Sequence, residues 1–147
     1  MITAVQIDDE VNALEFLRAR LNEVASEVNV LGVANNINDA EALIAEKKPQ
    51  LVFLDVEMPG GTGFELLKRL GRWDFDVIFT TGHSRYAIQA IRFSALDYLL
   101  KPVQADELRA AIDRHIANRN SAIPEVQQHF LNNIEQQEEN ALKLTLT

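Results

Sequence analysis

Short apolar stretches of this sequence end in side chains that can do chemistry with phosphate and metal ions. These side chains are Asp8, Asp9, Asp55, Thr80, Thr81 and Lys101. Carboxylates gathered in an apolar frame repel one another, so they either take up protons or bind a hard cation. Oxygen ligands with no His or Cys nearby favour Mg²⁺ over zinc. A carboxylate can also attack phosphorus, while a lysine and a hydroxyl hold the phosphoryl oxygens. The residue types therefore suit a carboxylate that accepts a phosphoryl group with Mg²⁺.

The elements that must position these groups are apolar strands alternating with helices, up to about residue 119. The expected strands cover residues 3–7, 28–34, 51–54, 76–82 and 95–100. The expected helices cover residues 11–24, a stretch from a cap at Asn38 or Asp39 to before Pro49, 64 to near Gly71, 84–93 and 105–119. Five such repeats predict an α/β fold, a parallel sheet covered by helices on both faces. Ligands of such sheets bind beyond the carboxyl ends of the strands, where the reactive side chains should meet.

The composition excludes several classes of function. The chain has 147 residues, a net charge of −8 and no cysteine. An acidic balance argues against direct binding to nucleic acid or to an anionic membrane, since both need a basic surface. No apolar run is long enough to span a membrane, and no basic region followed by an apolar stretch opens the chain. A cytoplasmic protein is the simplest expectation.

The composition changes after residue 119. Residues 120–140 are rich in Asn, Gln and Glu, with a thin apolar stripe at Val126, Phe130 and Ile134. This pattern predicts a helical linker, and it leaves open whether the stripe is only solvated or pairs with a second copy. Residues 141–147, "ALKLTLT", alternate like a strand. We expect them to begin a further domain that this chain lacks.

Four separated motifs resemble the receiver domain of two-component response regulators. They are "IDDE", "LDVEMPGGTGFELL", "FTTG" and "DYLLKP", and the resemblance covers about residues 1–119. It implies a flavodoxin-like (βα)5 doubly wound sheet with strand order 2-1-3-4-5. It also implies a sensor histidine kinase as partner and Asp55 as the phosphoacceptor. The segment "TTGHSRYAIQAIRFSALDYLLKP" resembles the subgroup with a C-terminal LytTR DNA-binding domain, and "LKLTLT" resembles the start of that domain. Contact with DNA and control of transcription would then belong to the absent domain.

The resemblance also assigns the metal ligands. Mg²⁺ would be held by Asp9, Asp55 and the backbone carbonyl of Glu57, with Asp8 assisting through water. Each aspartate alone could equally be a helix cap or a turn residue. Together with Lys101, they favour a site.

The remaining roles are implied in the same way. Thr81 matches the switch hydroxyl, whereas Thr80 is expected to be a strand residue. Lys101 matches the phosphate-binding lysine, in a Lys-Pro bond that is commonly cis in this family. Tyr98 matches the aromatic that turns inward as the threonine moves, and it can be a core residue at the same time. Glu57 and His83 match positions that tune dephosphorylation, although His83 is also simply read as a solvated loop residue.

Three functions compete on the sequence alone. The leading one is a phosphorylated signalling domain, not an enzyme beyond its own phosphorylation and dephosphorylation. It would dimerise when phosphorylated, through the surface around the fourth helix, fifth strand and fifth helix. A degenerate receiver acting only as an interaction module is the second. A phosphatase of the haloacid-dehalogenase type is the third, weakened because Glu57 stands where such enzymes need a second aspartate.

Overall fold

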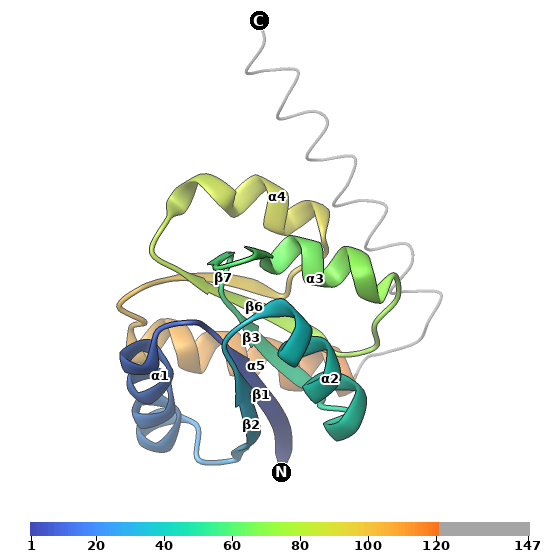
Figure 1. Cartoon of the computed structure of the whole chain (residues 1–147). Coiled ribbons are helices and arrows are strands. Elements are labelled where there is room, and N and C mark those ends of the chain that lie inside the picture. The colour runs from blue at the N-terminus through green and yellow to red at the C-terminus, as the bar shows by residue number, and fades with distance from the viewer. Residues whose placement is uncertain (121–147) are drawn as a thin grey trace, which may run out of the picture.

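The structure is a computed structural model that describes residues 1–120, and these residues form a parallel sheet covered by helices on both faces (Figure 1). The strands of the sheet are β1 (Ile2–Ile7), β2 (Val28–Ala34), β3 (Leu51–Leu54), β6 (Asp76–Thr81) and β7 (Asp97–Leu100). The helices are α1 (Val11–Val24), α2 (Ile37–Lys47), α3 (Gly63–Leu70), α4 (Ala87–Arg92) and α5 (Ala105–Asn120). The strand order is β2-β1-β3-β6-β7. The predicted flavodoxin-like fold and strand order 2-1-3-4-5 are therefore confirmed.

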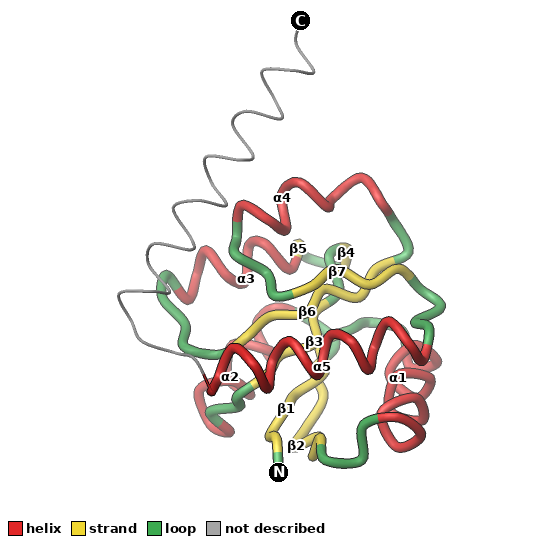
Figure 2. Tube along the Cα trace, turned by 180° about the vertical axis from the view of Figure 1, so that it is seen from behind, coloured by secondary structure: helices red, strands yellow, loops and turns green. Residues whose placement is uncertain are grey.

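The core has two layers, one on each face of the sheet. Helices α1 and α5 cover one face, which is the near face in Figure 2, and α2, α3 and α4 cover the other. Along β3, Leu51 and Phe53 pack toward α1 and α5, whereas Val52 and Leu54 pack toward the opposite layer. All four side chains are at most 1% exposed. A strand buried on both faces fixes the position of the residue that follows it.

Some boundaries differ from the sequence prediction. The cap of α2 is Asn36, whose side chain accepts a hydrogen bond from the Asp39 backbone N–H, so the predicted cap at Asn38 or Asp39 was wrong. The helix starts earlier because its first residue, Ile37, is buried at 4% exposure. The expected helix 84–93 is a 3-10 turn, η1 (Ser84–Tyr86), followed by α4.

A small antiparallel ribbon follows β3 and was not predicted. It pairs β4 (Glu57–Met58) with β5 (Gly61–Thr62). Gly60 turns between them with φ of 85°, a conformation that favours glycine. The ribbon leads directly into α3, whose N-cap is Thr62. It therefore sets the path of the chain beside the end of β3.

Two predictions about chain organisation concern residues that the structure does not describe. The predicted linker at 120–140 and the predicted domain start at 141–147 lie outside the described residues, except for Asn120 at the end of α5. Within residues 1–120, no helix combines the length and the apolar character that crossing a bilayer requires.

Candidate functional site

Asp55 lies directly beyond β3 and is 4% exposed. Its backbone N–H donates to the Ile7 carbonyl (2.9 Å), and its Oδ1 accepts the Val56 N–H (2.8 Å). Gly63 lies against this segment: a Cβ there would come within 2.4 Å of the Asp55 carbonyl oxygen. Only glycine lets α3 begin so close, and no sequence pattern had singled out Gly63. Asp55 is thus a buried carboxylate held on a fixed backbone.

The end of β1 brings further carboxylates to the same place. Asp8 is 5% exposed, and its Oδ1 accepts the Glu10 backbone N–H at 3.0 Å. Asp8, Asp9, Glu10 and Asp55 each offer an oxygen, and these oxygens lie within 4.8 Å of one another. The predicted gathering of Asp8, Asp9 and Asp55 is confirmed. Glu10 was not predicted as a site residue, although it follows Asp9 directly in the "DDE" motif.

Lys101 reaches this acidic cluster from the end of β7. Its Nζ lies 2.8 Å from Asp8 Oδ2, 3.4 Å from Asp55 Oδ2 and 3.8 Å from Glu10 Oε1. Its backbone N–H donates to the Thr81 carbonyl at 2.8 Å, which ties it to the neighbouring strand. The bond between Lys101 and Pro102 is cis, as the resemblance to the receiver family implies. One ammonium is therefore shared among three acids.

The charges in this cluster are not balanced. Burial, and then the charge of Asp8, raise the pKa of the Asp55 carboxyl to about 6, although Lys101 acts in the opposite direction. Burial lowers the pKa of Lys101, but its hydrogen bond to Asp8 and the charge of Asp55 outweigh this and leave the pKa raised. Four carboxylates facing one lysine lack positive charge. This all-oxygen donor set suits a hard divalent cation such as Mg²⁺.

The two threonines at the end of β6 are adjacent in the strand, so their side chains point to opposite faces of the sheet. Thr81 is fully buried, and its Oγ1 accepts the His83 backbone N–H at 3.4 Å. Thr80, expected to be only a strand residue, is 3% exposed and lines a cavity beside Lys101. The structure therefore places both hydroxyls close to the strand ends, as predicted for Thr81.

A second polar cluster joins the β4–β5 ribbon to the start of α4. The Glu57 carboxylate accepts hydrogen bonds from Arg85 and from the Tyr86 hydroxyl, and its Oε2 lies 2.9 Å from His83 Nε2. The hydrogen bond from Tyr86, together with His83 and Arg85, lowers the pKa of Glu57. The predicted pair Glu57 and His83 is therefore in contact. Arg85 and Tyr86 were missed because nothing in the local sequence pairs them with Glu57.

Tyr98 connects this cluster to the sheet. Its hydroxyl donates to the His83 backbone carbonyl, and its ring centroid lies 6.4 Å from that of Phe79. It is partly buried against the core, so it has both a core and a polar contact. Its role as a switch, and that of the Glu57 carbonyl as a metal ligand, stay predictions.

Comparison with protein families and curated relatives shows consistent similarity. A family model described as the response regulator receiver domain matches residues 4–113. An uncharacterized response regulatory protein of Vibrio vulnificus is 45% identical over 118 residues, covering 78% of this chain and 47% of the relative. The sensory transduction protein LytT of Bacillus subtilis is 32% identical over 117 residues, covering 78% and 48%. The chain thus spans about half the length of these relatives.

A solved structure supports the same fold. The crystal structure of the response regulatory domain of protein mrkE from Klebsiella pneumoniae aligns with a TM-score of 0.74. The alignment covers 82% of this chain and 100% of that one, at 20% sequence identity. At that identity the likeness shows the fold alone.

Proposed function

The chain belongs to the response regulator receiver family of two-component signalling, and on that premise we propose that Asp55 accepts a phosphoryl group from a sensor histidine kinase. The observation that supports this most is the buried Asp55 carboxylate, with Lys101 Nζ 3.4 Å from its Oδ2 and Asp8 on the same ammonium. A structural aspartate needs no such shared lysine. With a pKa of about 6, Asp55 is mostly ionised at neutral pH and can act as a nucleophile.

The transfer itself needs only one bond made and one broken. A carboxylate oxygen of Asp55 attacks the phosphorus of a phosphohistidine, and the nitrogen–phosphorus bond breaks. Its electron pair returns to the imidazole of the donor. Most of the catalysis is then positioning and charge stabilisation. In this proposal Lys101 would pair with one phosphoryl oxygen, and the Thr81 hydroxyl would donate to another.

Mg²⁺ fits the donor set of this site. When bound, it neutralises charge on the phosphoryl oxygens and on the acids around them. The residues that would hold it are Asp8, Asp9, Asp55 and the backbone carbonyl of Glu57. The raised pKa of Asp55 supports this assignment, because a cation would offset both the burial of the carboxylate and the repulsion from Asp8 that raise it.

The output proposed for this domain is a change on the α4–β7–α5 surface. Thr81 would move toward the phosphoryl group, and Tyr98 would then turn inward and release its bond to the His83 carbonyl. Ile88 and Ile91 on α4 and Leu100 on β7 are 44–45% exposed, which supports dimerisation there. We place this switch in the cytoplasm. DNA would be bound only by a further domain of the LytTR type, as part of transcriptional control.

Glu57 and His83 are proposed to set how long the phosphoryl group stays. Both lie on the loops after β3 and β6 and are linked to each other at 2.9 Å. A water that attacks the phosphoryl group would approach between these loops. The contacts of Glu57 with Arg85 and Tyr86 would slow that approach.

The two other functions have less support. A degenerate receiver is expected to lose an acid or the lysine, whereas Asp8, Asp55 and Lys101 are together here. A phosphatase of the haloacid-dehalogenase type does not agree with the family that matches residues 4–113. We therefore propose no catalytic turnover beyond phosphoryl acceptance and autodephosphorylation.

Acetyl phosphate with Mg²⁺ tests the proposal. The chain should gain the mass of one phosphoryl group, and Asp55→Asn should abolish the gain. Asp74→Asn is the matched control, since Asp74 is exposed and lies outside the cluster. No gain in the wild type, or a gain that survives in Asp55→Asn, would refute the proposal. Light scattering with and without beryllofluoride tests dimerisation separately.

A further inference from the structure

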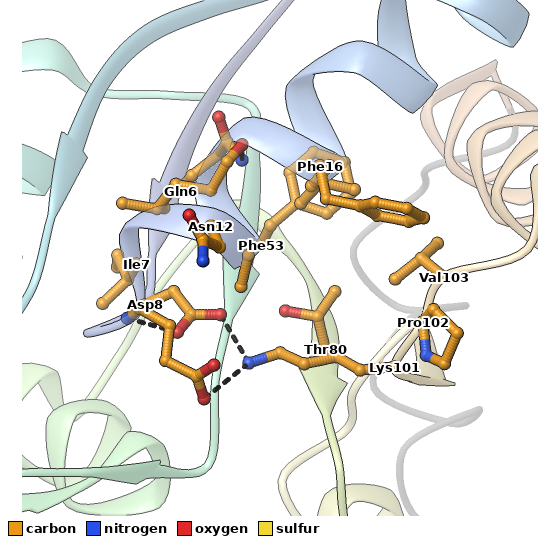
Figure 3. Close-up of a pocket in the computed structure, with 14 residues that line it drawn as sticks. Gln6, Ile7, Asp8, Asn12, Phe16, Phe53, Thr80, Lys101, Pro102 and Val103 are labelled. Carbon is orange, nitrogen blue, oxygen red and sulfur yellow. Dashed lines mark hydrogen bonds and ion pairs between the residues drawn. The ribbon is translucent and has the colours of Figure 1, made fainter.

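A cavity of about 320 Å³ lies beside the acidic cluster, between α1 and the segment after β7 (Figure 3). It lies on the α1 and α5 face of the sheet. Its lining includes Lys101 and Asp8 at one edge but neither Asp55 nor Thr81. Figure 3 shows Lys101 reaching away from Pro102 and Val103 toward the acids. The cavity thus adjoins the phosphorylation site and shares Asp8 and Lys101 with it, without including Asp55, and it is of a size that takes a small molecule.

Gln6 lines this cavity and carries a buried polar atom without a hydrogen-bond partner among the described residues. Its side chain is on β1 and is 1% exposed. Its Nε2 donates to the Leu14 carbonyl at 3.1 Å, which fixes the direction of the amide. Its Oε1 is buried and has no hydrogen-bond partner among residues 1–120. An unpaired buried acceptor costs about 1–3 kcal/mol, so a ligand that donates to it would recover that energy.

The other walls of the cavity are apolar and partly aromatic. They include Phe16, Leu17, Phe53, Pro102 and Val103. Phe53 is buried, but Phe16 is 40% exposed, with the Arg20 guanidinium 5.0 Å from its ring centroid. A flat aromatic ligand would cover the exposed ring and fill the apolar space. These walls therefore favour a ligand that is flat and apolar.

The charges at the edge select against anions. The carboxylates of Asp8 and Glu10 line the cavity, and Lys101 is already paired with both. A ligand with a negative charge would meet this acidic edge with no free cation among the lining residues. The acidic edge therefore disfavours an anion, and the apolar walls make it costly to desolvate a cation, so an uncharged ligand fits best.

We propose that this cavity binds a small uncharged aromatic molecule that carries one N–H or O–H group and donates it to Gln6 Oε1. The ligand would lie between α1 and Val103, with its apolar part against Phe16 and Phe53. Asp55 is not part of the lining, so binding to the unphosphorylated chain can be measured without a phosphodonor. Its failure would leave the proposed function untouched.

Indole and benzofuran form a matched pair of probes. They have nearly the same size and shape, but benzofuran has an oxygen in place of the N–H donor. Each is titrated into the ¹⁵N-labelled chain while backbone amide shifts are followed by NMR. We expect saturable shifts at Leu14 and Val103 with indole, and at least tenfold weaker binding of benzofuran, because its oxygen would face Gln6 Oε1. No saturable shift with either probe would mean that the cavity holds water only, and would overturn the proposal.

Two variants test the geometry. Gln6→Met keeps the length of the side chain and removes the acceptor, so indole and benzofuran should then bind equally. Ala13→Leu adds volume to the lining and should weaken indole at least tenfold. Ala19→Leu, on the same helix but outside the lining, is the control that should bind like the wild type. If Ala13→Leu, shown to be folded by its melting curve, still binds indole as tightly as Ala19→Leu, the proposal is wrong.

Discussion

Two aspartates at opposite ends of the sheet show how differently this fold treats a carboxylate at the end of a strand. Asp55 follows the carboxyl end of β3, and Asp76 begins the neighbouring strand β6. The oxygens of Asp76 have separate partners: His115 Nδ1 lies 2.7 Å from Oδ2, and Asn118 Nδ2 donates to Oδ1 at 3.0 Å. Asp55 instead shares the Lys101 ammonium with Asp8 and Glu10.

We interpret this difference as one between a structural site at Asp76 and the proposed phosphorylation site at Asp55. The contact between Asp76 and His115 joins the amino end of the sheet to α5. His115 lies on that helix and is only 1% exposed. The Asp55 cluster has too little positive charge to balance its carboxylates, which lowers the stability of the fold. A bound cation would relieve this repulsion. Removing a partner should therefore cost stability at Asp76 and reactivity at Asp55.

The largest expected effect is on phosphorylation when Lys101 is replaced. Lys101→Met keeps most of the apolar stem but removes the only ammonium that contacts Asp55 in residues 1–120. Loss of one such group typically costs 10²–10³-fold in rate. We expect a fall of about that size in the rate of phosphorylation by acetyl phosphate, measured by mass spectrometry. Lys68→Met, on the exposed side of α3, should leave the rate unchanged, and an unchanged rate in Lys101→Met would contradict the role of this lysine.

The second largest expected effect is a loss of folding stability when Asp76 is replaced. Asp76→Ala would leave the buried His115 without its carboxylate partner, and such a loss costs about 2–3 kcal/mol. Urea unfolding should show this decrease, while phosphorylation of the folded variant continues at the wild-type rate. Asp74→Ala, exposed and two residues away, is the control and should change stability by less than about 0.5 kcal/mol. Equal stability of the two variants would remove the contrast between the two ends of the sheet.

The Asp55 end was predictable from sequence, and the Asp76 end was not. Asp8, Asp55 and Lys101 each follow an apolar run, and parallel strands bring such positions to one edge. Asp76 and His115 are 39 residues apart, and no motif relates a strand start to a position inside a helix. The contacts of Glu57 with Arg85 and Tyr86 could not be predicted either, because no motif relates these distant positions. They depend on the β4–β5 ribbon, which is too short to leave a periodic pattern.

The smallest expected effect is a gain in stability when the Asp55 charge is removed. Burial and the neighbouring Asp8 raise the pKa of Asp55 from 3.8 to about 6. Between these two values the folded protein binds more protons than the unfolded chain, so this carboxyl makes stability fall as pH rises through that window. Above about pH 6 the cost is nearly complete, and a shift of this size corresponds to at most about 3 kcal/mol.

Asp55→Asn should therefore be more stable than the wild type at pH 7.5 by about 1–2 kcal/mol in EDTA, and nearly equal to it at pH 4. Urea unfolding at the two pH values measures the difference. Asp74→Asn, exposed and outside the acidic cluster, should show no such pH dependence. Adding Mg²⁺ at pH 7.5 should stabilise the wild type more than Asp55→Asn, since a cation relieves the repulsion that the variant lacks. A gain that is the same at both pH values would mean that packing, rather than the unbalanced charge, distinguishes Asp55 from Asp76.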